Sequence, residues 1–110
     1  MIRALIVSVA ILFLSACSNP LPPDRSNYVG QWRGKAMALW ILQDGSVSYR
    51  RLKKGVNTEI NGPLKAFVGD DFVVGIWFLT TTFKVSEPPN KVDEVWYMTV
   101  DDVRLTKVSE

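Results

Sequence analysis

Residues 36–54, AMALWILQDGSVSYRRLKK, decide the fold that this sequence predicts. Two apolar-rich runs flank Asp44-Gly45. An Asp-Gly pair in this setting is typical of a β-hairpin, because a type I′ turn needs positive φ at both central positions. The stretch therefore predicts two antiparallel strands that are joined at Asp44-Gly45.

The alternation of short apolar runs and turn-forming residues continues along the chain, and no stretch keeps a helical period. Strands are predicted near 31–43, 46–54, 57–61, 64–68, 72–78, 79–85, 94–100 and 103–108. Reversals are predicted at Asn61-Gly62-Pro63, Gly69-Asp70-Asp71 and Asp101-Asp102, and a loop at Ser86–Lys91 with Pro88-Pro89. We therefore expect one all-β domain over residues 28–110. It would be a small antiparallel meander of seven or eight short strands, barrel-like or folded as a compact sandwich.

Two runs, Ala36–Leu42 and Phe72–Leu79, are apolar at almost every position. In a half-buried strand alternate side chains face water, so something should cover the second side of these runs. One interpretation is a bend or bulge, for instance at Gly34 or Gly75, that switches the strand between two packed layers. The other is an exposed apolar patch that meets a lipid, a ligand or a protein.

The N-terminal segment has the features of an export signal. Arg3 precedes Ala4–Leu14, a run of 11 residues that is apolar apart from Ser8. A membrane-spanning helix needs about 17 to 25 apolar residues, so this run is too short to be an anchor. The next residues close the tetrapeptide Leu14-Ser15-Ala16-Cys17, which resembles the lipobox of bacterial lipoproteins.

That resemblance implies that residues 1–16 are a lipoprotein signal peptide, cleaved between Ala16 and Cys17, and that the Cys17 thiol carries a diacylglycerol anchor. Residues 17–27 would be the lipidated cysteine and a proline-rich spacer, which reaches about 30 Å at roughly 3.1 Å per residue of polyproline-like chain. Ser18 stands where an aspartate resembles an inner-membrane retention signal in enterobacterial lipoproteins. We therefore expect the protein in the bacterial cell envelope, anchored in the outer membrane and facing the periplasm.

The composition argues against several classes of function. The chain has no histidine and its one cysteine is Cys17, so the usual general base, metal ligand and cysteine nucleophile are missing. Removal of Arg3 with the signal leaves 94 residues and lowers the formal charge from +2 to +1, which gives no basic footprint for nucleic acid. Adjacent carboxylates fall at predicted turns, where aspartate is favoured locally; these pairs are Asp70-Asp71, Asp93-Glu94 and Asp101-Asp102. We expect no enzymatic activity, no metal and no cofactor.

Four tryptophans are the most conspicuous side chains of the predicted domain: Trp32, Trp40, Trp77 and Trp96. Large aromatics usually stabilise small cores, and exposed indoles would instead suit stacking on sugar rings. Gly30-Gln31-Trp32 resembles the Gly-x-Trp opening of lipocalin-type barrels, which implies that Trp32 lies in the core near the start of the first strand.

The predicted strand 46–54 ends in a charge cluster, Arg50, Arg51, Lys53 and Lys54. Strand alternation places Arg51 and Lys53 on one face and Arg50 and Lys54 on the other. The cations either keep an edge strand from aggregating or contact anionic headgroups or a phosphate-bearing glycolipid. The candidate binding surface therefore comprises Trp40, Trp77, Lys53 and Lys54.

Three functions fit these features. The first is a membrane-anchored, non-enzymatic binding module whose partner is another envelope protein. The second is a lipocalin-like carrier or sensor, which would hold a small apolar ligand in a cavity of roughly 300 Å³ or more. The third is an inhibitor of an envelope hydrolase that acts through the Ser86–Lys91 loop.

Overall fold

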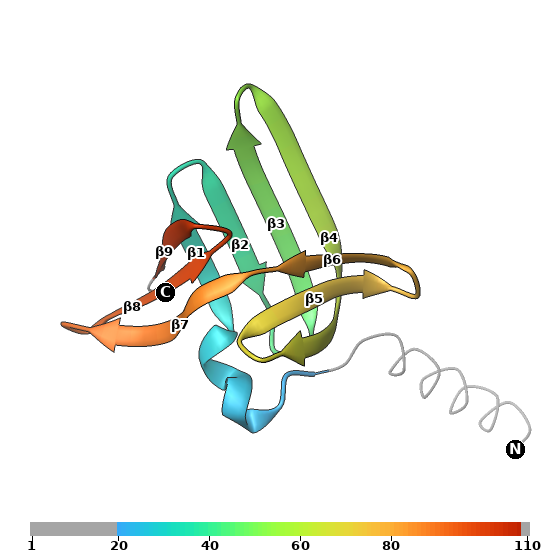
Figure 1. Ribbon diagram of the computed structural model, residues 1–110. Helices are drawn as coiled ribbons and strands as arrows, with labels where there is room; N and C mark the ends of the chain where they lie inside the picture. The colour runs from blue at the N-terminus through green and yellow to red at the C-terminus, as the bar shows by residue number, and fades with distance from the viewer. Residues whose placement is uncertain (1–19, 109–110) are drawn as a thin grey trace, which may run out of the picture.

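The computed structural model describes residues 20–108, so the predicted signal peptide, cleavage site and lipidated Cys17 lie outside the described residues (Figure 1). A short 3-10 helix, η1 (Pro23–Tyr28), precedes nine strands. The strands are β1 (Gly30–Gly34), β2 (Met37–Ile41), β3 (Ser46–Lys53), β4 (Val56–Val68), β5 (Asp71–Ile76), β6 (Leu79–Phe83), β7 (Val85–Val92), β8 (Val95–Val100) and β9 (Val103–Lys107). The all-β prediction is confirmed, with nine described strands in place of seven or eight.

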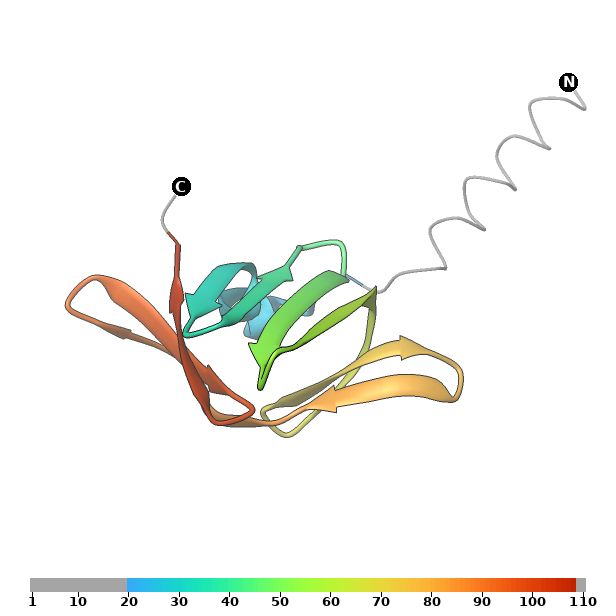
Figure 2. The same ribbon diagram turned by 90° about the horizontal axis from the view of Figure 1, so that it is seen from above.

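All neighbouring strands are antiparallel, in the order β6-β5-β4-β3-β2-β1-β9-β8-β7. The sheet curls, so that β5 to β8 cross over the wall made by β1 to β4 and give a barrel-like shape (Figures 1 and 2). The two ends of the sheet, β6 and β7, are separated in the chain by Lys84 alone. Two aspartate side chains bind the backbone at this β6–β7 connection. Asp71 Oδ1 accepts a hydrogen bond from the Val85 N–H at 2.7 Å, and Asp101 Oδ1 accepts one from the Lys84 N–H at 3.0 Å.

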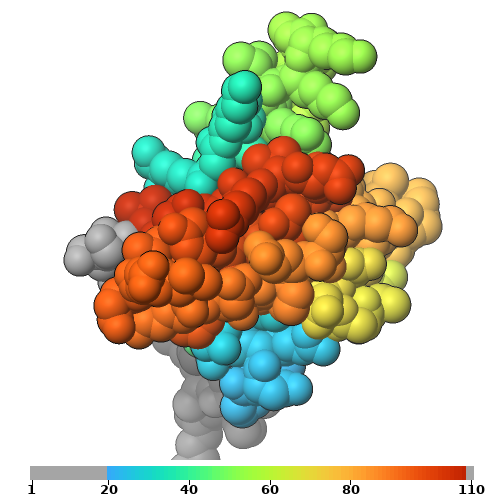
Figure 3. Space-filling view, turned by 60° about the vertical axis from the view of Figure 1, so that its left-hand side comes forward, coloured from blue at the N-terminus to red at the C-terminus, as the bar shows by residue number. Residues whose placement is uncertain are grey.

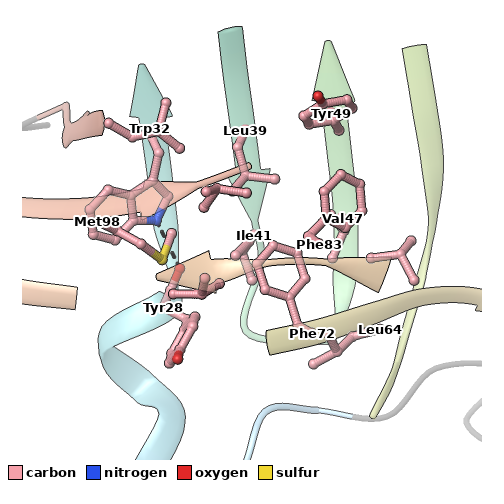
Figure 4. Packing of buried hydrophobic residues seen from close by; sticks show 14 of the residues in the cluster. Tyr28, Trp32, Leu39, Ile41, Val47, Tyr49, Leu64, Phe72, Phe83 and Met98 are labelled. Atoms are coloured by element: carbon pink, nitrogen blue, oxygen red, sulfur yellow. Dashed lines mark hydrogen bonds between the residues drawn. The ribbon is translucent and has the colours of Figure 1, made fainter. Parts of the chain in front are cut away.

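The core lies between β1 to β4 on one side and β5 to β8 on the other, and it is filled by large side chains (Figure 4). Trp32 is fully buried, as predicted, and its indole N–H donates to the Tyr28 carbonyl at 2.9 Å. Phe72 and Phe83 stack with ring centroids 5.0 Å apart. The other fully buried large side chains are Leu39, Ile41, Val74, Met98, Val100 and Leu105. The middle of the barrel is therefore occupied by the protein's own side chains.

The predicted hairpin at Asp44-Gly45 is confirmed as a reversal, but its geometry differs from a type I′ turn. Only Gly45 has positive φ there. The Leu42 N–H donates to the Ser46 carbonyl at 2.9 Å, and the Leu42 carbonyl accepts from the Gly45 N–H at 3.0 Å. This is the pattern of a three-residue loop that ends in a left-handed residue. Positive φ at both residues of a two-residue loop occurs at Lys54-Gly55, Asp93-Glu94 and Asp101-Asp102.

The prediction of one strand over 31–43 is wrong, because the chain reverses at Lys35-Ala36 and forms β1 and β2. Ala36 takes the left-handed conformation at φ 57°, which its residue type does not signal. Gly34 precedes this turn, and a Cβ there would lie 2.7 Å from the Arg104 carbonyl oxygen. The close approach of β9 explains the glycine, so Gly34 marks a reversal and not a switch between layers.

The predicted reversal at Asn61-Gly62-Pro63 is also wrong, since β4 continues through these residues without reversing. Up to Pro63 this strand pairs with β3, and from Leu64 onward it pairs with β5. Proline has no N–H to donate, so it suits the point where one partner strand ends and the next begins. Gly62 and Pro63 therefore mark an exchange of partners along one long strand.

The segment Ser86–Lys91 is part of β7, although it was predicted as a loop. β7 pairs with β8 along one edge only, and its register shifts between Val85 and Glu87 and between Glu87 and Asn90. An edge strand with bulges tolerates prolines, which explains Pro88 and Pro89. The inhibitor hypothesis loses the loop on which it depended.

The domain begins earlier than residue 28, because much of the predicted spacer 18–27 packs against it. Leu21 is only 4 % exposed, and its N–H donates to the Gln43 carbonyl at 3.2 Å. In η1, the Arg25 guanidinium lies 4.7 Å from the Phe67 ring centroid, and the Tyr28 hydroxyl donates to the Asp70 carbonyl at 2.9 Å. Burial of Leu21 and these contacts outweigh the extended preference of the prolines. An extended spacer is thus wrong for residues 20–27.

Candidate functional site

An apolar groove lies on the outer face of β2, β3 and β4. Along β2, Met37, Leu39 and Ile41 point into the core, and Trp40 therefore points outward with half of its surface exposed. Trp40 pairs across the sheet with Ser48, which in turn pairs with Asn61. Because Ser48 is small, the sheet surface is hollow beside the indole.

This groove has a volume of about 460 Å³. Its lining comprises Trp40, Leu42, Ser46, Val47, Ser48, Asn61, Gly62 and Pro63. Its surface is mostly apolar and includes the side chains of Trp40, Leu42 and Pro63, while the two serines and Asn61 supply hydrogen-bonding groups. An apolar hollow with a few polar groups can bind a side chain or a small apolar molecule.

A second apolar surface is the end of the β5–β6 hairpin, which we call the apolar tip. It consists of Ile76, Trp77, Phe78 and Leu79, which are 56, 80, 83 and 69 % exposed. Ile76 pairs with Leu79, so Trp77 and Phe78 form the two-residue loop. The apolar run Phe72–Leu79 is thus buried at its start and exposed at its end, as the patch interpretation predicted.

The backbone of the apolar tip has an unusual conformation. Trp77 has φ 55°, which is rare for a bulky side chain, and its carbonyl accepts a hydrogen bond from the Lys65 ammonium at 2.8 Å. Gly75 has φ 133°, and a Cβ there would collide with the Leu79 backbone. Local strain of this kind is often retained where the loop has a binding role.

The charge cluster lies at the far end of the β3–β4 hairpin, which projects above β7 and β8 in Figure 3. Arg51 and Lys53 share one groove, of about 430 Å³, as their spacing predicted, and Arg50 lies 3.7 Å from Glu59. Lys54 is in the turn and not on a strand face. β3 lies between β2 and β4 over most of its length, so the edge-strand interpretation of this cluster is wrong.

This end of the domain carries more positive than negative charge. Lys84, Asp71, Asp101 and Asp102 also line the groove of Arg51 and Lys53, and an adjoining groove adds three further cations. These are Lys35, Lys54 and Arg104. Among residues 20–108, Arg51, Lys53 and Lys84 form no ion pair within 4 Å.

The structure does not bring the four predicted binding residues together. Trp40 lies in the outer groove, Trp77 in the apolar tip, and Lys53 and Lys54 at the projecting hairpin end. Residue type alone could not identify Pro63 as a groove residue, because its predicted role was in a turn. Phe78 and Lys65 were missed as well, although the apolar run through Leu79 could have indicated Phe78.

The remaining tryptophans have structural roles. Trp96 packs against the core, and the Lys107 ammonium lies 4.8 and 5.2 Å from the ring centroids of Trp32 and Trp96. The same ammonium donates to the Asn27 carbonyl at 3.0 Å, and burial lowers the pKa of Lys107. These contacts hold η1 and β9 against the core.

Within residues 20–108, no three His, Cys, Asp or Glu side chains are grouped as metal ligands would be. The described part of the chain also has no helix with the length and apolar character to cross a membrane. No protein-family model matches the chain, and the searches found no similar curated protein and no similar solved structure.

Proposed function

We propose that the protein is a lipid-anchored, non-enzymatic binding module of the bacterial envelope. In this proposal Cys17 carries the lipid and holds the chain in the outer membrane, on the periplasmic side. The all-β domain binds another envelope protein, and it uses neither a metal nor a cofactor.

The apolar groove beside Trp40 is the observation that carries the proposal. Trp40 and Leu42 are large apolar side chains that the fold leaves exposed while it buries Met37, Leu39 and Ile41. Exposed apolar patches rimmed by polar groups mark interaction sites in soluble domains. Tryptophan is also among the residues that contribute most to binding energy at protein interfaces.

A carrier or sensor of a small apolar ligand is the second candidate. The groove volume of about 460 Å³ is within the range of small-molecule sites, which is the specific observation in its favour. The ligand would lie on the outer face of the sheet, since core side chains fill the interior. A bound small molecule and a bound protein are distinguished by mass.

Native mass spectrometry of the full-length, affinity-tagged protein released from its own envelope membranes tests both candidates. Wild type is compared with the double variant Trp40→Ser/Leu42→Ser and with the control Val92→Ser. Val92 is 48 % exposed, a fraction similar to those of Trp40 and Leu42, but it lies on β7 and does not line the groove.

We expect a stoichiometric protein partner with wild type and with the control, and its loss with the groove variant. A small-molecule mass that depends on Trp40 and Leu42 would instead support the carrier. A partner that the groove variant retains would contradict the assignment of the groove, and robust hydrolase activity of the purified protein would contradict the non-enzymatic proposal.

A further inference from the structure

The apolar tip is the most exposed apolar feature among residues 20–108. Its four side chains are consecutive and each is more than half exposed, with Trp77 and Phe78 above three quarters. Isolated surface hydrophobics are ordinary, but a contiguous apolar surface at the end of a hairpin needs a partner. Tryptophan and phenylalanine are also the side chains that enter the boundary between headgroups and acyl chains.

The apolar tip lies on the same side of the domain as the start of the described chain. Pro20 and Lys65 line one groove, and the Lys65 ammonium donates to the Trp77 carbonyl at 2.8 Å. Figures 1 and 2 agree on this arrangement, since the chain enters on the side toward which the β5–β6 turn points.

The chain between the predicted anchor and the domain is short. Three residue steps separate Cys17 from Pro20, and a fully extended chain spans at most about 11 Å over three residues. Leu21 is fixed by its burial and by its bond to the Gln43 carbonyl, so it cannot lengthen the connection without breaking the fold. A lipid on Cys17 would therefore hold this side of the domain against the headgroups.

The cationic end of the domain is the competing membrane contact, and its position argues against it. Lys54 precedes β4, whereas Leu64 lines the groove of Pro20 toward the other end of that strand. The eight residue steps from Val56 to Leu64 cover about 26 Å of strand. The projecting hairpin therefore points away from the place where the chain approaches the anchor.

We infer that the apolar tip inserts into the same bilayer leaflet that holds the lipid on Cys17, which rests on the lipid anchor of the proposed function. The indole of Trp77 and the ring of Phe78 enter the interface between headgroups and acyl chains, and Lys65 remains among the headgroups. Two attachments, the lipid and the apolar tip, fix the orientation of the domain on the membrane.

The test uses full-length protein purified from envelope membranes and reconstituted into phosphatidylethanolamine and phosphatidylglycerol vesicles. Quenching of tryptophan fluorescence by lipids brominated on the acyl chains is measured for wild type, Trp77→Phe and Trp40→Phe. Trp77→Phe keeps an aromatic side chain in the apolar tip and removes its fluorescence. Trp40→Phe is the matched control, because its indole is exposed on another surface. Circular dichroism and intact mass establish that each variant is folded and lipidated.

Insertion predicts that Trp77→Phe loses most of the quenching seen in wild type and that Trp40→Phe keeps it. Equal quenching of wild type and Trp77→Phe in lipidated protein would overturn the inference and leave the lipid anchor intact. The apolar tip would then be free to contact a protein. An intact mass with an unmodified Cys17 would instead overturn the proposed anchor, and with it the inference that rests on it.

Discussion

Leu21→Ala tests whether the residues before β1 belong to the folded domain. The leucine side chain is 4 % exposed and lies in the same cluster as Tyr28 and Trp32. Truncation to alanine removes three carbon atoms, which are worth about 0.8 kcal/mol each in transfer free energy. A partly filled cavity adds to that loss, so we expect the free energy of unfolding to fall by about 3 kcal/mol.

Urea unfolding of the chain that begins at residue 18 measures this loss, with tryptophan fluorescence as the signal. For a domain of this size the urea slope is about 1 kcal/mol per molar, so the midpoint should fall by about 3 M at an unchanged slope. Leu52→Ala is the matched control, because Leu52 is 55 % exposed; it should lose less than about 1 kcal/mol.

Ordinary surface substitutions change the free energy of unfolding by no more than about 0.5 kcal/mol, and a change that small in Leu21→Ala would contradict the burial of Leu21. Residues 20–27 would then behave as the spacer that their prolines predict. The short connection between Cys17 and the domain, on which the orientation of the apolar tip depends, would be lost with it.

Three further substitutions test the fold. Asp71→Ala leaves the Val85 N–H without its partner and should lower the free energy of unfolding by about 1 to 3 kcal/mol. Asp71→Asn keeps an acceptor oxygen, so its free energy of unfolding should fall by less. An equal fall in both variants would argue against the hydrogen bond. Tyr28→Phe removes the hydrogen bond to the Asp70 carbonyl, at a cost of about 1 kcal/mol in urea unfolding at neutral pH. Burial raises the pKa of Tyr28, so the phenol of the unfolded chain loses its proton at a lower pH than that of the folded chain. Above about pH 10 the free energy of unfolding of wild type should therefore fall more steeply with pH than that of Tyr28→Phe. Parallel pH profiles for the two proteins would contradict this. Gly75→Ala places a methyl group against the β6 backbone and should speed amide hydrogen exchange in β5 and β6, while unchanged exchange there would argue against the close approach.

Local sequence signals sufficed for the fold class and for most of the strands. Asp44-Gly45 and Asp101-Asp102 are turn pairs whose chemistry is local, and both reversals are present. Gly30-Gln31-Trp32 predicts a core position for Trp32, which is fully buried. The general preference of large aromatics for small cores is wrong for Trp40 and Trp77, which are 50 and 80 % exposed.

The errors have a different origin, since they depend on partners that are distant in sequence. Gly62-Pro63 resembles a turn, but β3 and β5 hold the two halves of β4 and keep the chain extended. Pro88-Pro89 resembles a loop, but one-sided pairing with β8 makes it an edge strand. Leu21 gives no signal by itself, because its burial depends on the loop that contains Gln43.

The candidate surfaces were predictable only in part. The apolar run Ala36–Leu42 indicated that one of its two faces was buried and left the other open. Trp40 lines its groove together with Ser48 of β3 and Gly62 of β4, and only the sheet register brings these residues together. Pro20 and the apolar tip lie on the same side of the domain because the sheet curls, and the sequence carries no local signal for that curl.

The intact mass of the full-length protein, extracted from its own envelope membranes, tests the lipid-anchored account most directly. Lipidation predicts a chain that begins at Cys17 and carries the added mass of a diacylglycerol, with or without a further acyl chain on its amino group. A mass that matches residues 1–110 with an unmodified thiol would contradict it.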